Sequence, residues 1–203
     1  MKRIYTDNHG LLNKWFGTVL FLCIGLVGYS QGEFNNWYFG NLKGVTFNSG
    51  YPVLLTGNAM STGGVTVNVS DSAGNLWFYC NGNKVYNRTN VLMPNGSGLW
   101  GRGNWSFGQC VTAVQDPADD SSYFILTAGL YQFNSTDLTP AAYSVVNMRL
   151  NNRLGDVVAT QKNIPLNHGQ KGYSSITGTR HKNNRDAWVV VKLMDVDSNW
   201  YAA

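Results

Sequence analysis

A pattern of strand, polar turn and strand recurs three times along this chain of 203 residues, and it constrains the fold more than any other feature. In each copy, an alternating or β-branched segment leads into a turn rich in Asp, Asn, Gly or Pro, and the next strand opens near an aromatic residue. Asp and Asn bond to the nearby backbone, Pro fixes φ and Gly accepts a positive φ. Each copy therefore predicts a β-hairpin, and the paired strands are 64–70 with 75–80, 110–115 with 122–127, and 175–179 with 187–193.

The spacing of these hairpins indicates the architecture. Further strands are expected at 84–87, 142–148 and 156–159, and the aromatic residues Trp77, Tyr123 and Trp188 mark equivalent points. Propeller repeats have four strands and run at about 40–50 residues. We therefore predict an all-β, propeller-like fold with about three four-stranded antiparallel blades.

A ring of that kind needs roughly four to eight blades to close. We therefore expect an incomplete ring, and residues 31–203 to be the N-terminal part of a propeller-like domain in a longer protein. The strand-like sequence at 199–203 favours the same interpretation. A complete β-sandwich is the alternative.

The composition agrees with a β fold and excludes some partners. Charged residues make up 13% of the chain and apolar residues 43%, which is enough to build a core. The net charge is +4, but the positive residues are scattered, and the tightest group, Arg180, Lys182 and Arg185, lies in a polar turn. Nucleic-acid binding calls for cations and aromatics on one face. We expect no nucleic-acid partner.

Residues 1–30 have the three parts of a secretory signal peptide. A basic start precedes the apolar run 16–27, which is too short to cross roughly 30 Å of hydrocarbon. Small residues, Gly28 and Ser30, then stand before Gln31, where the signal would be cut. We expect a secreted or cell-surface protein with no stable membrane span after cleavage. An uncleaved anchor is the alternative, whereas lipidation at Cys23 lacks the small residues that it requires.

Several motifs resemble the start of a large group of Bacteroidota surface proteins that the type IX secretion system exports. In that group, a propeller-like N-terminal region is often followed by PKD-type repeats and by the gliding-motility-associated sorting domain. The resemblance spans nearly all of residues 34–203, and its motifs occur at 35–40, 45–50, 70–79, 85–88, 93–96 and 143–148.

This resemblance implies a location and an architecture but no activity. It implies export by the type IX machinery, which would act through a C-terminal sorting domain that this chain lacks. It also implies that the tripeptide 71–73, Asp-Ser-Ala, is an acceptor for O-glycosylation at Ser72.

No catalytic motif is apparent. His168 and His181 lie in polar loops without the nucleophile spacing of a hydrolase. Asp116, Asp119 and Asp120 lack the glycine and glutamate of a calcium-binding EF-hand and are better explained as a hairpin turn. We assign no catalytic residue, metal site or cofactor, and whether the protein is an enzyme stays open.

Cysteines and aromatics are the remaining candidates. Cys80 and Cys110 form either a disulfide or two small buried hydrophobes. The aromatic residues to consider are those at 37–39, 77, 100, 105, 188 and 200. Any that are exposed would stack on sugar rings or protein surfaces, whereas Trp77 and Trp188 are expected in the core. Our candidate ligand-binding residues lie in the glycine-rich loop 98–105, because loops often carry recognition. They are Trp100, Arg102 and Trp105.

The sequence thus predicts a non-enzymatic interaction module, adhesive in character, that binds glycans or surface proteins. The alternative is a secreted hydrolase or lyase that acts on a polysaccharide from a propeller face. An aspartate cluster lining one pocket would favour the alternative.

Overall fold

The computed structural model of the chain describes residues 32–101, 108–129, 139–166, 172–183, 185–193 and 200–202. These residues form one compact unit that begins at Gly32. The predicted signal peptide lies outside the described residues.

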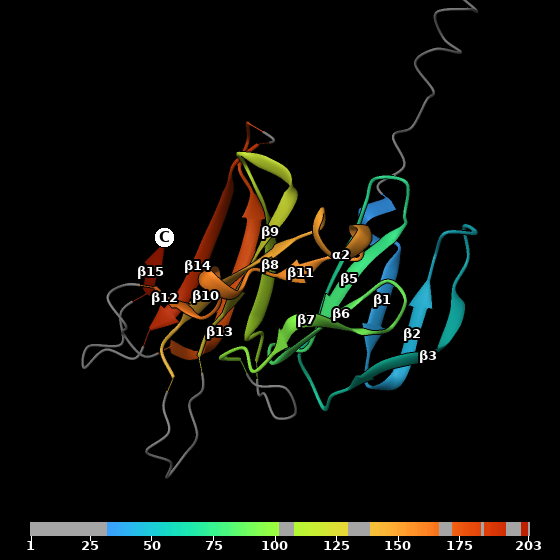
Figure 1. The fold of residues 1–203 in the computed structure, drawn as a ribbon, viewed down its shortest axis with the longest axis horizontal. Helices are drawn as coiled ribbons and strands as arrows, with labels where there is room; N and C mark the ends of the chain where they lie inside the picture. The colour runs from blue at the N-terminus through green and yellow to red at the C-terminus, as the bar shows by residue number, and fades with distance from the viewer. Residues whose placement is uncertain are drawn as a thin grey trace, which may run out of the picture. The chain divides into compact units, whose positions relative to one another are not determined.

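Four antiparallel sheets follow one another along the chain (Figure 1). The first begins after a 3-10 turn, η1 (Gly32–Phe34), and consists of β1 (Asn36–Phe39), β2 (Asn41–Thr46) and β3 (Val53–Ser61). The second consists of β4 (Val67–Ser70), β5 (Leu76–Cys80), β6 (Lys84–Asn87) and β7 (Leu92–Ser97). In both sheets each strand pairs with the next one along the chain.

The third sheet has five strands and the fourth has three. The third consists of β8 (Val111–Asp116), β9 (Asp119–Thr127), β10 (Ala142–Asn147) and β11 (Asp156–Val157), with β12 (Ile164–Pro165) also pairing with β10. The fourth consists of β13 (Gly172–Arg180), β14 (Ala187–Leu193) and β15 (Trp200–Ala202). Two short helical segments, α2 (Leu150–Arg153) and η2 (Ala159–Gln161), connect strands of the third sheet.

The first strands of the four sheets are neighbours in space. β1 lies against β4, β4 against β8, and β8 against β13. At the opposite edges of the second and third sheets, β7 lies against β11. Successive sheets therefore meet in the order of the chain.

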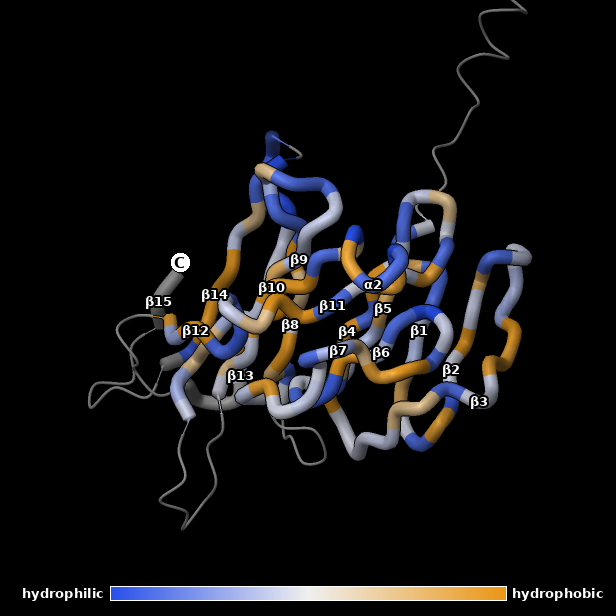
Figure 2. The backbone as a smooth tube through the Cα atoms, in the orientation of Figure 1, coloured by the Kyte–Doolittle hydropathy of each residue, from blue (hydrophilic) through white to orange (hydrophobic). Residues whose placement is uncertain are grey.

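Two groups of buried side chains hold the sheets together. The larger group joins the second, third and fourth sheets, and its fully buried members include Phe78, Val85, Ile125 and Val146. The smaller group, Met60, Tyr79 and Tyr86, lies between the first and second sheets. Figure 2 shows a run of hydrophobic residues along β14 and a hydrophilic turn between β8 and β9.

The structure confirms the all-β prediction and the three hairpins, and β6 matches the predicted strand 84–87. The number of units is corrected. The described residues form four sheets of three, four, five and three strands, so the expectation of about three four-stranded units was wrong. The first sheet is the one that was not predicted as strands.

The prediction for Trp188 was also wrong. It was expected in the core, but it is 52% exposed and its ring lies against His181. Its strand alternates instead, because Val189 and Val191 are buried. Trp77 is partly buried and packs on the core, as expected.

Candidate functional site

Exposed large apolar side chains gather on the first sheet and on the η1 turn before it. A soluble surface tolerates single apolar side chains, so a concentration of them in one part of the fold makes that part a candidate contact surface. The group lies within residues 34–54 and consists of Phe34, Trp37, Phe39, Leu42, Tyr51, Val53 and Leu54.

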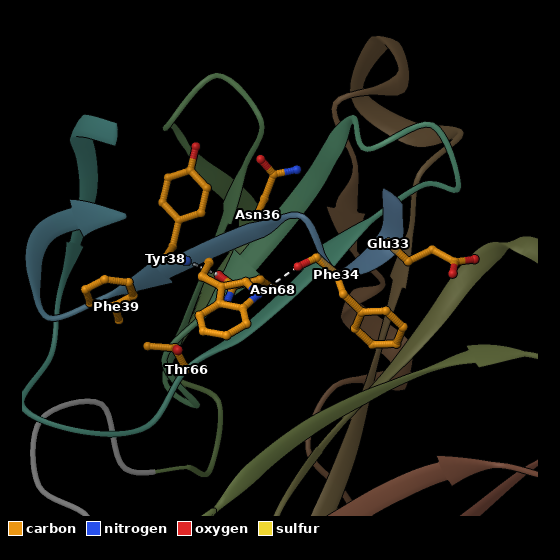
Figure 3. Close-up of a pocket in the computed structure, with 8 residues that line it drawn as sticks. Glu33, Phe34, Asn36, Tyr38, Phe39, Thr66 and Asn68 are labelled. Atoms are coloured by element: carbon orange, nitrogen blue, oxygen red, sulfur yellow. Dashed lines mark hydrogen bonds between the residues drawn. The ribbon is translucent and has the colours of Figure 1, made fainter. Parts of the chain in front are cut away.

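The side chains of β1 alternate between the two faces of the strand. Asn36 and Tyr38 face the second sheet, where Asn36 Nδ2 donates to Ser70 Oγ (3.0 Å) and to the carbonyl oxygen of Gly74 (2.7 Å). Trp37 and Phe39 belong to the opposite face and are exposed. Figure 3 shows Asn36 and Tyr38 on one side of β1, with Phe39 on the other.

A pocket of about 350 Å³ lies beside β1 and takes lining residues from both faces of this strand. Its volume is at the lower end of the range for ligand pockets. In Figure 3, Phe34 and Phe39 stand at opposite ends of the group, and Thr66 and Asn68 lie between them. We call it the aromatic pocket, and its lining residues are Glu33, Phe34, Asn36, Trp37, Tyr38, Phe39, Thr66 and Asn68.

Trp37 is held in place although its side chain is 53% exposed. Its Nε1–H donates to the carbonyl oxygen of Phe34 (2.7 Å), and its ring meets Phe47 edge to face, with centroids 5.5 Å apart. The polar atom of the indole is therefore satisfied within the protein. What the residue offers to a ligand is its apolar ring surface.

The polar groups of the pocket come mainly from β4 and the segment before it. Asn68 Oδ1 accepts the backbone N–H of Tyr38 (3.0 Å), so Asn68 ties β4 to β1. Since this oxygen is engaged, the amide N–H groups of Asn68 are what it can offer a ligand. Thr66 adds a hydroxyl group.

The charge of the pocket is balanced. Glu33 is its one acidic lining residue, and Arg180 Nη2 of β13 lies 3.2 Å from Glu33 Oε1. Tyr38 is the other titratable lining residue, and burial raises the pKa of its phenol. The pocket is therefore suited to neutral ligands that have apolar faces and polar edges.

The loop chosen from the sequence is only partly described. The backbone N–H of Trp100 donates to Asn163 Oδ1 (3.0 Å), and its carbonyl oxygen accepts from the Thr139 hydroxyl (3.2 Å). Arg102 and Trp105 lie outside the described residues, so their grouping with Trp100 stays a prediction. Residues 37–39 were not among the predicted ligand-binding residues, and the run of three aromatic residues close to Phe34 was the available signal.

Ser72 and the two cysteines are all described. Ser72 is exposed in the turn between β4 and β5, so its hydroxyl is accessible, and its glycosylation stays a prediction. Cys80 and Cys110 are fully buried thiols in the larger core group, and no bond joins them in the structure. Burial as thiols agrees with the alternative of small buried hydrophobes, and a disulfide between them stays a prediction.

A second pocket, of about 410 Å³, lies at the turn between β8 and β9. Asp116, Asp119 and Asp120 line it together with Arg149 and Arg185. The expected acidic hairpin turn is present, because Asp116 Oδ1 accepts the N–H of Ala118 (2.8 Å) and Asp116 pairs with Asp119. Within the described residues, no group of three acids, histidines or cysteines is arranged to hold a metal ion.

Comparisons of this chain with protein-family models, curated proteins and solved structures found no match. None of the described helices has the length and hydropathy of a transmembrane span.

Proposed function

We propose that this protein is a non-enzymatic interaction module that contacts its partner through the aromatic pocket. The observation that carries the proposal is Trp37, which is more than half exposed and yet fixed by its bond to Phe34. Aromatic residues supply a large contact area at low conformational cost and are enriched in interfaces. An adhesive role on a cell surface fits such a module.

Binding of the purified chain to bacterial surface polysaccharides and to outer-surface protein fractions tests this function. We expect retention on at least one of these materials and its loss in Trp37→Ala. Trp188→Ala is the matched control, because Trp188 is 52% exposed but does not line the pocket. Turnover of a substrate without stable binding would contradict the proposal.

Export belongs to the same proposal, and the basic and apolar segments of residues 1–30 support it. The motif resemblance to type IX secreted surface proteins supports a cell-surface location. Expression in a Bacteroidota host tests both points. We expect an extracellular product whose N-terminus is Gln31, and an uncleaved cytoplasmic product would argue against export.

We further propose that the four sheets are blades of a propeller-like domain. The succession of neighbouring first strands, β1 to β4 to β8 to β13, supports this arrangement, since the first strand of each blade lies nearest the axis of a propeller. An experimental structure of the chain tests it. Two sheets facing each other across one core, as in a β-sandwich, would contradict it.

A polysaccharide hydrolase is the second candidate, because three aspartates line one pocket beside the turn between β8 and β9. A catalytic acid of this type needs a raised pKa. The pKa of Asp119 is instead lowered, by hydrogen bonds from Ser121 and Ser122 and by the nearby Arg149. Release of reducing sugars that is lost in both Asp116→Asn and Asp120→Asn would establish this candidate in place of the first.

A further inference from the structure

We propose that the aromatic pocket binds a linear, neutral oligosaccharide. This inference rests on the proposed interaction function and names its ligand class. A pyranose ring has apolar C–H faces and hydroxyl edges, so it matches a site that offers aromatic surfaces beside amide and hydroxyl groups. The aromatic pocket offers both kinds of group, from β1 and from β4.

The order of the aromatic side chains favours an extended ligand. Phe34 and Phe39 stand at opposite ends of the pocket in Figure 3, and Trp37 lies between them in sequence. Phe34 and Trp37 are 69% and 53% exposed, so the site is open to solvent rather than closed around one ring. A chain of sugar rings can lie along such a surface, each ring meeting a different aromatic side chain.

Trp37 is prepared for stacking before any ligand arrives. Its bond to the Phe34 carbonyl oxygen and its edge-to-face contact with Phe47 restrict the indole. Binding therefore costs little additional side-chain entropy at this residue. The electron-rich face of the indole is the surface that C–H groups of a sugar would meet.

The polar groups select a neutral ligand. Among the described lining residues there is no Lys or Arg, and the guanidinium of Arg180 beside the pocket is already paired with Glu33, so the site is poorly suited to phosphates and uronic acids. Glu33 is paired with Arg180 and does not present a free carboxylate to the ligand. The amide of Asn68 and the hydroxyl of Thr66 suit hydroxyl groups at the edge of a sugar ring.

An extended peptide is disfavoured by the backbone of β1. Peptides that add to a sheet bond to free main-chain groups along a strand edge. On β1, one such group is already taken, since the N–H of Tyr38 donates to Asn68 Oδ1. The site therefore offers side chains to a ligand more than it offers a strand edge.

Titration calorimetry with the full chain tests the ligand class. The probes are cellohexaose, xylohexaose, mannohexaose and chitohexaose, with polygalacturonate as the anionic comparison. We expect at least one neutral hexaose to bind, with its disaccharide binding more weakly because it cannot span the site. Trp37→Ala should weaken this binding at least about fivefold, as expected for an interface anchor, whereas Trp188→Ala should leave it unchanged.

Two further variants keep the test decisive if Trp37→Ala is poorly folded. Phe34→Ala removes a side chain that is mostly exposed, and Asn68→Asp keeps the acceptor for Tyr38 while removing the amide donors. Both variants should weaken binding of whichever hexaose the wild type binds. Thermal unfolding of each variant verifies that it is folded.

Failure to bind every neutral hexaose would overturn the inference, as would equal binding by all pocket variants. If surface proteins are retained through Trp37 while no sugar binds, the interaction function stands and the ligand class is wrong. If neither sugars nor surface materials bind through Trp37, both proposals fail. Preferential binding of polygalacturonate would show an anionic ligand instead.

Discussion

The rings of Tyr38 and Tyr79 stack almost in parallel, with centroids 4.6 Å apart and 5° between their planes. Tyr79 stacks in turn on Tyr86, with centroids 5.3 Å apart. This column joins β1 of the first sheet to β5 and β6 of the second. It therefore anchors β1, whose four residues all line the aromatic pocket.

Removing the Tyr79 hydroxyl should destabilise this junction. The hydroxyl oxygen accepts a hydrogen bond from the N–H of Ala59, and the O–H donates one to Asn90 Oδ1, each at 3.0 Å. Tyr79→Phe leaves both groups without this partner, so we expect a loss of about 1–3 kcal/mol in the free energy of unfolding. Urea denaturation measures it. Tyr38→Phe also keeps its stacked ring but removes a hydroxyl that makes neither of these two bonds, so it should cost clearly less. Equal costs would contradict this account.

Gly74 should not tolerate a side chain. Its φ is +86°, and an added Cβ would lie 2.2 Å from Asn48 Oδ1. Gly50 has a similar φ of +82° but open space around it, so Gly50→Ala isolates the backbone cost of about 1–2 kcal/mol. Gly74→Ala should lose about 1–3 kcal/mol more through the clash. Chemical denaturation measures the loss of stability in both variants, and equal losses would contradict the prediction.

Asp119 should make stability depend on pH. Hydrogen bonds from the Ser121 hydroxyl and N–H, and from the Ser122 hydroxyl, lower its pKa, and Arg149 adds to the effect. A lowered folded-state pKa stabilises the fold above the unfolded value of 3.8, and the effect disappears as pH falls through the folded value. The wild type should therefore exceed Asp119→Asn in stability at pH 7 but not below the folded-state pKa.

Denaturation at a series of pH values measures this difference. Ser122→Ala is the control, because it removes one hydrogen bond to the carboxylate and should shrink the pH-dependent gap without abolishing it. A gap that stays constant from pH 7 to pH 2 would show that Asp119 contributes only through packing.

The buried thiols should be inert in the folded protein. Burial raises the pKa of Cys80 to about 12, and both Cys80 and Cys110 have no exposed surface. Since the thiolate is the reactive form, a thiol reagent at pH 8 should label neither residue until the protein unfolds. The experiment uses a Cys23→Ser variant, so that Cys80 and Cys110 are the two cysteines that the reagent can label. Absence of labelling even in urea would show that they form a disulfide.

The hairpins were predictable because their signals are local. The turn 71–75 shows why: Asp71 Oδ1 accepts the N–H groups of Ala73 and Asn75, so residues adjacent in sequence fix the turn themselves. The same holds for the turn between β8 and β9, where Asp116 bonds to Ala118. Here the chemistry of a few neighbouring residues decides the structure.

The first sheet and the aromatic pocket were not predictable in the same way. β3 carries Val53 and Leu54 exposed and contains Gly57, so it shows no regular burial pattern. The contact of Asn68 with Tyr38 joins residues 30 positions apart, a pairing that no local pattern contains. Trp188 was expected in the core, but the side chains of β14 alternate between buried and more exposed positions, and Trp188 lies at an exposed one.

The ion pair between Glu33 and Arg180 has a consequence for biosynthesis. The two residues are separated by 147 positions, so a ribosome that adds roughly 5–20 residues per second makes Arg180 many seconds after Glu33. Until Arg180 has been made, Glu33 does not have this partner. The pairing that neutralises this end of the proposed sugar site therefore depends on the fourth sheet.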